Sequence, residues 1–457
     1  MMMLSQAAQA TSGKLLGSDA PFNSVSTDSR KISANELFVA LRGEHFDGYE
    51  FIAQAAQRGA AAALVNADSY KAHPPLSDFS SSVVIVEDTR LALGQLAANW
   101  RRQFDILLVA VTGSNGKTTV KEMLSSILRE AAGSAEAVLA TQGNLNNDIG
   151  MPLTLLQLNA AHRYGVIEMG MNHAGEIDYL TGIAAPDVAL INNASGAHLE
   201  GLGSVEAVAR AKGEIFSGLQ HHGTAVMNAD DEHVPIWRAL AGAHPLLEFG
   251  LDPHADVSGT WQPRNDGLQL EVRTPQGNFT ALLQVPGEHN ARNALAATAA
   301  AIALSIPLEK IVVGLEKFGG VAGRLQRKSA LHGASLIDDT YNANPASVRA
   351  AISVLAQVSG KHILVLGDMG ELGEEAATFH AQIGSEARRA GIEKLYGLGV
   401  LSGNAVREFG SGARHFEHIE ELLPALEKEL DAQTTVLVKG SRFMKMERVV
   451  QFCCTVH

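Results

Sequence analysis

Short apolar runs alternate with longer amphipathic segments through the middle of the chain. The apolar runs have the length of strands buried on both faces, and they lie at 106–111, 166–169, 188–192 and 224–227. A segment with helical spacing of its apolar residues follows each run, at 118–132, 174–183, 205–219 and 231–240. This repetition predicts a parallel sheet with helices on both faces.

The pattern changes toward the end of this central region. Positions 261–285 alternate between apolar and polar residues and are punctuated by Gly and Pro, which predicts antiparallel hairpins. Helical spacing then returns at 290–303 and 308–318.

A smaller α/β pattern flanks the central region on each side. Before it, strands are expected at 36–41, 61–65 and 82–86, with a loop at Pro74-Pro75 and a helix at 91–102. After it, strands are expected at 335–337, 363–366, 394–398 and 435–438, and helices at 346–356, 374–390 and 419–430. The sequence therefore predicts three α/β domains, which we place at 1–90, 91–320 and 321–457.

Charge and composition narrow the class of protein. The formal net charge of −13 argues against a general nucleic-acid binder, which would carry a basic face. The only two cysteines, Cys453 and Cys454, are neighbours and are unsuited to a mutual disulfide or a metal site. Residues 1–14 lack the features of a signal peptide, and no apolar stretch is long enough to span a membrane. We therefore expect a cytoplasmic protein.

The strongest chemical signal is a Gly-rich loop between a predicted strand and a predicted helix. It reads T-G-S-N-G-K-T-T and comprises Thr112, Gly113, Ser114, Asn115, Gly116, Lys117, Thr118 and Thr119. In this context backbone N–H groups and the helix N-terminus bind phosphates, the lysine reaches the β- and γ-phosphates, and the first threonine ligates Mg²⁺. One position departs from the general phosphate-loop motif, because Val111 stands where a glycine is usual. The loop predicts ATP binding by a P-loop ATPase-like domain.

This loop resembles that of the Mur ligase superfamily, which includes the folylpolyglutamate synthetases. The resemblance extends over all three regions. It implies a small N-terminal α/β domain that binds a UDP-linked substrate, a central P-loop ATPase-like domain and a C-terminal Rossmann-like α/β domain. It also implies a ligase that uses ATP and Mg²⁺, with two ions expected, and activates a carboxylate as an acyl phosphate.

Two kinds of segment resemble the substrate-binding parts of the family. S-T-D-S-R at 26–30 and A-L-R-G-E-H-F-D-G at 40–48 resemble the UDP-sugar segments, and T-Q-G-N-L-N-N at 141–147 resembles a loop that holds the nucleotide-peptide substrate. Such residues also serve as helix caps and turn formers, which is the alternative interpretation. The resemblance makes these residues substrate-binding candidates: Thr27, Ser29, Arg30, Asp47, Gly48, Thr141, Asn144, Asn146 and Asn147.

Three further residues are implied as metal-site residues in addition to Thr118. Glu168 lies at the end of one predicted strand and His198 follows another, where side chains of an α/β sheet face the ligand crevice. Lys212 stands in A-K-G-E-I-F, where the family carries a lysine carbamylated by CO₂, so that an anionic side chain supports Mg²⁺. A surface or capping role for Glu168, a structural histidine and a solvated lysine are the competing interpretations. We also expect His198 and Lys212 to act in catalysis, together with Lys117 and Arg324.

The rest of the ATP site is implied by motifs in the second and third regions. Asn293 in G-E-H-N-A-R-N is expected to bind adenine, and Arg324 after Gly323 is expected to contact the γ-phosphate. In D-D-T-Y-N-A-N-P at 338–345, Asp339 is expected near the ribose and Tyr341 near the adenine. Two Gly-containing segments, 366–373 and 438–444, either line the acceptor side of the cleft or form tight turns.

The motifs favour one activity within the superfamily. The D-D-T-Y-N-A-N-P segment is present and a D-N-P-R motif is not, which favours the member that joins D-Ala-D-Ala to UDP-MurNAc-tripeptide. We expect a monomer that binds these two substrates. The alternatives are another ligase of the superfamily, such as a UDP-MurNAc-dipeptide ligase or a folylpolyglutamate synthetase, a P-loop kinase or ATPase without an amino-acid acceptor, and a non-catalytic relative that only binds nucleotide. The third residue of the tripeptide, diaminopimelate or lysine, is left open.

Overall fold

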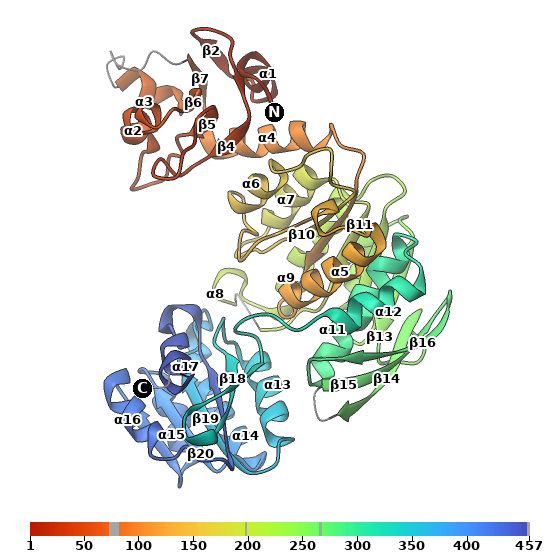
Figure 1. Cartoon of the computed structure of the whole chain (residues 1–457), viewed down its shortest axis with the longest axis vertical. Helices are drawn as coiled ribbons and strands as arrows, with labels where there is room; N and C mark the ends of the chain where they lie inside the picture. Colours follow the sequence, from red (N-terminus) through yellow and green to blue (C-terminus); the bar gives the residue numbers. More distant parts are fainter. Residues whose placement is uncertain (73–81, 197–198, 265–266, 455–457) are drawn as a thin grey trace.

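Three α/β units follow one another along the longest axis of the molecule, as the sequence predicts (Figure 1). The computed structural model describes residues 1–72, 82–196, 199–264 and 267–454. The predicted loop at Pro74-Pro75 and the metal-site candidate His198 lie outside these ranges. Among the helices of the described ranges, none combines the length and the apolar character needed to cross a membrane.

The N-terminal unit is built on a five-stranded sheet. Its order is β2(Lys14–Leu16)-β7(Ser82–Val86)-β6(Ala62–Asn66)-β5(Glu36–Val39)-β4(Ser24–Ser26), with β4 to β7 parallel and β2 antiparallel. Helices α1(Leu4–Ala10), α2(Ile52–Gln57) and α3(Ala67–Ala72) accompany it, and β1(Met2–Met3) pairs with β3(Pro21–Phe22). Helix α4(Thr89–Arg101) contacts α1 and β6 of this unit and also α6(Gly150–Leu155) and α7(Glu176–Ala184) of the next. It therefore joins the two units.

The central unit contains a nine-stranded mixed sheet. Its order is β16(Gly277–Leu283)-β15(Gly267–Thr274)-β14(Val257–Arg264)-β13(Leu246–Gly250)-β12(Thr224–Asn228)-β11(Val188–Ile191)-β8(Leu107–Thr112)-β10(Tyr164–Glu168)-β9(Val138–Ala140). The strands from β9 to β14 are parallel, and β14, β15 and β16 form the predicted antiparallel hairpins. Two separate apolar clusters cover its faces. The parallel sheet with helices on both faces is thus confirmed.

The six predicted helices of the central unit are present with shifted ends, and two short helices at Gly150–Leu155 and Leu199–Leu202 were not predicted. They are α5(Lys117–Ala132), α6, α7, α8(Leu199–Leu202), α9(Val205–Gly213), α10(Val234–Ala241), α11(Glu288–Ala303) and α12(Leu308–Lys317). The helix expected at 205–219 is divided, because α9 ends at Gly213 and a 3₁₀ turn occupies Glu214–Gly218. Strands β9 and β13 were not predicted, since β9 has only 3 residues and 3 of the 5 residues of β13 are not buried.

The C-terminal unit is a six-stranded sheet between two helical layers. Its order is β17(Gln326–Ser329)-β18(Ser335–Asp339)-β22(Thr434–Lys439)-β19(Lys361–Gly367)-β20(Lys394–Leu398)-β21(Ala413–Phe416), parallel except for the edge strand β17. The helices are α13(Pro345–Ala356), α14(Ala376–Arg389), α15(Ser402–Phe409), α16(Ile419–Glu427) and α17(Glu447–Cys454). Strands β17 and β21 and helices α15 and α17 were not predicted. The two edge strands are largely polar, so they lack the apolar signal of the buried strands.

The sheet register brings the polar ends of three central strands together. Glu168 at the end of β10 is paired with Val111 of β8, and Ile191 at the end of β11 is paired with Thr112. Because these strands are parallel, the loops that follow them leave the same edge of the sheet. The phosphate loop, Glu168 and the segment after β11 are therefore neighbours.

Gly384 of α14 allows a close approach that a larger residue would prevent. A Cβ atom there would lie 2.0 Å from the carbonyl oxygen of Ala405 in α15. We expect G384A to lower the free energy of unfolding by about 1–3 kcal/mol, because the two helices must separate. Chemical denaturation measures this, with G182A in α7 as the control. Gly182 has no atom within 4 Å of its added Cβ, so G182A should stabilise by up to about 1 kcal/mol. An unchanged or raised stability in G384A would contradict this packing argument.

Candidate active site

A cavity of about 1360 Å³ is lined by residues of the central and C-terminal units and by the start of α4. Most residues predicted for the ATP and metal sites line it: Ser114, Asn115, Gly116, Lys117, Thr118, Thr119, Glu168, Asn293, Arg324, Asp339 and Tyr341. Of the predicted substrate-binding residues, Asn144, Asn146 and Asn147 line it as well. The cavity thus brings together side chains that are up to 352 residues apart in the sequence, from Arg90 to Arg442.

The phosphate loop turns between β8 and α5 with two glycines in conformations that favour glycine. Gly116 has φ 81°, and a Cβ there would lie 2.4 Å from both Asn192 Nδ2 and Asn293 Oδ1. Val111, the departure from the general motif, is fully buried within β8, and the turn begins only at Gly113, with φ 152°. The loop therefore does not need a glycine at position 111. Thr112 is also buried, and its hydroxyl donates to Met169 O at 2.9 Å, so it supports the loop without facing the cavity.

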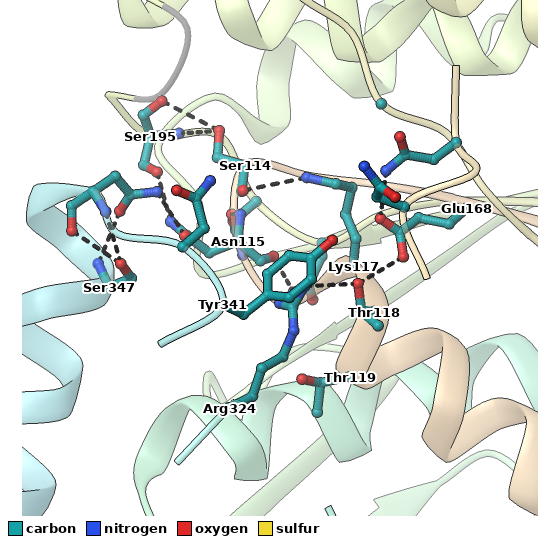
Figure 2. Close-up of a pocket in the computed structure, with 18 of the residues that line it drawn as sticks. Ser114, Asn115, Lys117, Thr118, Thr119, Glu168, Ser195, Arg324, Tyr341 and Ser347 are labelled. Atoms are coloured by element: carbon teal, nitrogen blue, oxygen red, sulfur yellow. Dashed lines mark hydrogen bonds between the residues drawn. The ribbon is translucent and has the colours of Figure 1, made fainter. Parts of the chain in front are cut away.

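The Lys117 ammonium lies inside this loop (Figure 2). Its Nζ donates to Gly113 O at 2.6 Å and more weakly to Ser114 O at 3.4 Å. Burial lowers the pKa of Lys117, an effect that the nearby carboxylate of Glu168 opposes and the guanidinium of Arg324 reinforces. An anionic phosphate in the loop would favour the charged ammonium again.

Thr118 connects a carboxylate of the central unit to an arginine of the C-terminal unit (Figure 2). Its hydroxyl donates to Glu168 Oε2 at 2.7 Å and accepts from Arg324 Nη2 at 2.9 Å. The other Glu168 oxygen accepts from Asn146 Nδ2 at 2.7 Å, and the Thr141 hydroxyl accepts from the backbone N–H of Glu168. Thr141 itself is buried behind the cavity wall. A hydroxyl and a carboxylate side by side form an oxygen donor set that fits Mg²⁺.

Arg324 is placed by an aromatic ring as well as by Thr118. Its guanidinium carbon lies 4.3 Å from the centroid of the Tyr341 ring, a stacked cation–π arrangement. Its Nε is buried and has no hydrogen-bond partner within the part of the chain that the structure describes. The guanidinium therefore has donor capacity left for an anion in the cavity.

Several residues of this site were not singled out from the sequence. Asn344, the N-cap of α13, donates from Nδ2 to Asn115 Oδ1 at 2.8 Å and so joins the C-terminal unit to the phosphate loop. Asn192 donates to Asn115 O and to Asn293 Oδ1, both at 2.9 Å. Lys439 Nζ donates to Asp339 Oδ2 at 2.5 Å. Asn192 directly follows β11, Lys439 ends β22 and Asn344 precedes a Pro at the start of α13, and these positions are the signal that could have found them.

Lys212 lies in the last turn of α9 and is 1% exposed. Within the described ranges it makes no hydrogen bond or ion pair, and it does not line the cavity. Burial, reinforced by the positive charge of Lys117, lowers the pKa of Lys212 well below its usual value. Lys121 is buried to the same extent, but its Nζ donates to Thr141 O at 2.7 Å and pairs with Glu122 at 2.5 Å. The amine of Lys212 is therefore favoured in the neutral, reactive form.

The predicted residues of the first region lie in the N-terminal unit and do not line the cavity. The Ser29 hydroxyl donates to Gln54 at 2.7 Å, and Arg30 pairs with Asp28 on the surface. Asp47 caps the 3₁₀ turn that begins at Gly48, whose N–H donates to Leu41 O at 2.8 Å. Thr27 follows β4 directly. The structure therefore places these residues together on one unit, apart from the phosphate loop.

Models of known families match nearly all of the chain. The Mur ligase family catalytic domain matches residues 21–101, the Mur ligase middle domain matches 111–301, and the glutamate ligase domain of Mur ligases matches 323–442. A UDP-N-acetylmuramoyl-tripeptide–D-alanyl-D-alanine ligase of Escherichia coli strain K12 is 42% identical, with 98% of this chain and 97% of that protein covered.

Solved structures agree with these matches. A UDP-N-acetylmuramoylalanyl-D-glutamyl-2,6-diaminopimelate–D-alanyl-D-alanyl ligase from Acinetobacter baumannii is 37% identical, with a TM-score of 0.86 and 98% and 96% of the two chains covered. A MurF ligase from Thermotoga maritima in complex with ADP is 27% identical, with a TM-score of 0.80 and 94% and 96% covered. The phosphate loop, the three-unit architecture and these matches lead to one conclusion: the chain belongs to the Mur ligase family.

Proposed function

We propose that this chain is an ATP-dependent ligase that joins D-alanyl-D-alanine to UDP-MurNAc-tripeptide and forms UDP-MurNAc-pentapeptide, ADP and phosphate. The observation that carries the proposal is the 42% identity to a ligase of this activity over nearly the whole chain. The cavity agrees with it, because a phosphate loop, a buried carboxylate and an arginine of another unit face one another there.

The reaction has two steps in which atoms and charges balance. The terminal carboxylate of the tripeptide attacks the γ-phosphorus of ATP, which gives an acyl phosphate and ADP. The amine of D-Ala-D-Ala then attacks the acyl carbon, loses a proton, and inorganic phosphate leaves. The first step brings anions together, so Lys117 and Arg324 are proposed to offset the repulsion and to stabilise the charge that develops on the transferred phosphoryl group.

The remaining site residues are proposed to bind the metal ions, the nucleoside of ATP and the two ends of the UDP-linked substrate. Thr118 and Glu168 would hold Mg²⁺, which supplies charge neutralisation at the phosphate oxygens when bound. Lys212 as a carbamate and His198 are proposed to support a second ion. Asn293, Asp339 and Tyr341 are proposed to bind the nucleoside of ATP, and Asn144, Asn146 and Asn147 the peptide. The first-region residues are proposed to bind the UDP end of the substrate.

We also propose that the functional domains are 1–90, 91–320 and 321–457, and that the protein acts as a cytoplasmic monomer. The ATP contacts come from the second and third domains and the UDP contacts from the first. Closure of the domains around the bound substrates is therefore part of the proposed mechanism.

The proposed activity predicts that phosphate release from ATP requires both UDP-MurNAc-tripeptide and D-Ala-D-Ala. Purified protein with ATP and Mg²⁺ should release phosphate when UDP-MurNAc-tripeptide and D-Ala-D-Ala are present together, and mass spectrometry should find the UDP-pentapeptide. Each substrate alone should give only background. Absence of stimulation by the pair would refute the assignment. Folate with glutamate, and UDP-MurNAc-dipeptide with diaminopimelate or lysine, would then test the other ligases of the superfamily.

Arg324→Ala should remove turnover and spare substrate binding. Because the guanidinium acts on the transferred phosphoryl group, we expect kcat to fall about 10³-fold or more, with the Kd of UDP-MurNAc-tripeptide nearly unchanged. Steady-state kinetics and calorimetric titration measure the two quantities. R264A is the control, because Arg264 lies in the β14–β15 hairpin, bonds to Gln269 and does not line the cavity. If R324A kept turnover, the proposed role of Arg324 and the closure model would both be wrong.

Lys212 is predicted to form a carbamate with CO₂, and Lys121 is not. The neutral Nζ attacks the carbon of CO₂, an N–C bond forms, and a proton is released to solvent. Protein in ¹³C-labelled bicarbonate should give a carbamate carbon resonance that is lost in K212R and kept in K121R. K212R should also lower kcat strongly. A resonance that persists in K212R would contradict the assignment of the modified lysine.

A further inference from the structure

An ion pair that the proposed chemistry does not use lies on the wall of the cavity. Arg90, in the first turn of α4, pairs through Nη2 with Asp148 Oδ2 of the loop before α6. Both residues line the cavity, and their side chains are 48% and 33% exposed. The pair joins the element that follows the N-terminal sheet to the loop that carries the asparagine candidates. We expect a substrate that extends from the N-terminal unit to the phosphate loop to pass beside this pair, because the pair and the loop line the same cavity.

Asp148 is close in sequence to Asn146, which contacts the carboxylate of Glu168. It follows Asn147, whose Oδ1 accepts from Gly150 N at 2.8 Å, and it stands two residues after Asn146, which donates to Glu168. The third residue of the tripeptide carries the carboxylate that is activated near Glu168 and Lys117. A side chain of that same residue, extending a few bonds away, therefore reaches the region of Arg90 and Asp148.

The wall around the pair suits an aliphatic chain with a charged end. Leu91, Met171, Tyr179 and Leu180 also line the cavity, and Leu91 is half-exposed there. Burial, together with Asp148 and Asp88, raises the pKa of the Tyr179 phenol, so this ring stays neutral. Two other carboxylates nearby are already engaged. Asp88 caps α4 by accepting from Arg90 N and Leu91 N, and Glu176 accepts from Asn172 N and His173 N.

The charges of the pair match a ligand that carries both signs. A partly exposed ion pair adds little to the stability of the fold, so opening it costs little free energy. A side-chain end with an ammonium and a carboxylate gives Asp148 and Arg90 each a new partner of opposite charge, and a guanidinium binds a carboxylate through two parallel hydrogen bonds. A side chain that ends in an ammonium alone leaves Arg90 without a counter-charge and places a second cation beside it.

We propose that Arg90 and Asp148 form a specificity subsite for a third-residue side chain that ends in an amino-acid zwitterion, the chemistry of 2,6-diaminopimelate, and that they select it over lysine. This inference rests on the proposed function, and it assigns the choice that the sequence left open. Asp148 receives the ammonium of the side-chain end and Arg90 receives its carboxylate.

The test compares two substrates in one assay with ATP and D-Ala-D-Ala at saturation. kcat/KM is measured for UDP-MurNAc-tripeptides that end in meso-diaminopimelate or in L-lysine. The wild-type chain should prefer diaminopimelate by about tenfold or more. R90Q should lower kcat/KM for diaminopimelate by about 10- to 100-fold and leave the value for lysine unchanged or higher. D148N should lower both, since both side chains carry the ammonium.

A matched control separates specificity from general disturbance. Arg238 is 49% exposed and pairs with Glu248 away from the cavity, so R238Q removes a comparable ion pair and should change neither value. If R90Q lowers the melting temperature, R90K is measured in its place. R90K keeps the positive charge but cannot form the two parallel hydrogen bonds to a carboxylate. It should therefore lower kcat/KM less than R90Q does, and only for the diaminopimelate substrate.

The outcomes distinguish the subsite from the proposed function. Equal losses for both substrates in R90Q would mean that the pair only braces α4 against the loop, and a wild-type preference for lysine would also overturn the subsite. Turnover of neither tripeptide by the wild-type chain would refute the ligase activity itself, and with it this inference.

Discussion

The hydroxyl of Thr118 links the phosphate loop of the central unit to the C-terminal unit. It donates to Glu168 at the end of β10 and accepts from Arg324 of the C-terminal unit. A hydroxyl can serve both partners because it carries one donor and two acceptor sites. The parallel register of β8 and β10 makes the first contact possible, since it brings the loop after one strand beside the last residue of the other. The position of Arg324 relative to the phosphate loop depends on the second contact.

Several basic side chains are buried close to one another at this site, and this limits which ligands it can bind. Lys117, Arg324 and Lys212 are close enough for Arg324 to lower the pKa of Lys117, and for Lys117 to lower that of Lys212. A cluster of buried positive groups is costly unless anions accompany it. Bound phosphates would supply anions at Lys117 and Arg324, and the proposed carbamylation, which turns an amine into an anion, would supply one at Lys212. The arrangement thus favours anionic ligands for a physical reason that is independent of the family resemblance.

The placement of the units determines how far one substrate must extend. The N-terminal unit carries the candidates for the UDP end, whereas the phosphate loop lies in the central unit and α4 links the two (Figure 1). Arg90 and Asp148 lie where this link meets the asparagine loop. A substrate bound from the N-terminal unit to the phosphate loop makes contacts far from its reacting carboxylate. Such contacts can help to orient that carboxylate for reaction.

The sequence by itself determined the local elements and the chemistry that they carry. Runs of buried apolar residues predicted the strands, and T-G-S-N-G-K-T-T predicted a phosphate loop, because both depend on neighbours a few residues apart. Short polar strands such as β17 and β21 escaped prediction, since pairing with a partner strand, not their own composition, stabilises them. Only the tertiary structure decided that Arg324 contacts Thr118, 206 residues away, that Asn344 contacts Asn115, and that Lys212 is buried without a partner in the described ranges while Lys121 has two. These outcomes depend on how whole sheets pack and which charges burial leaves uncompensated, and no local pattern encodes either.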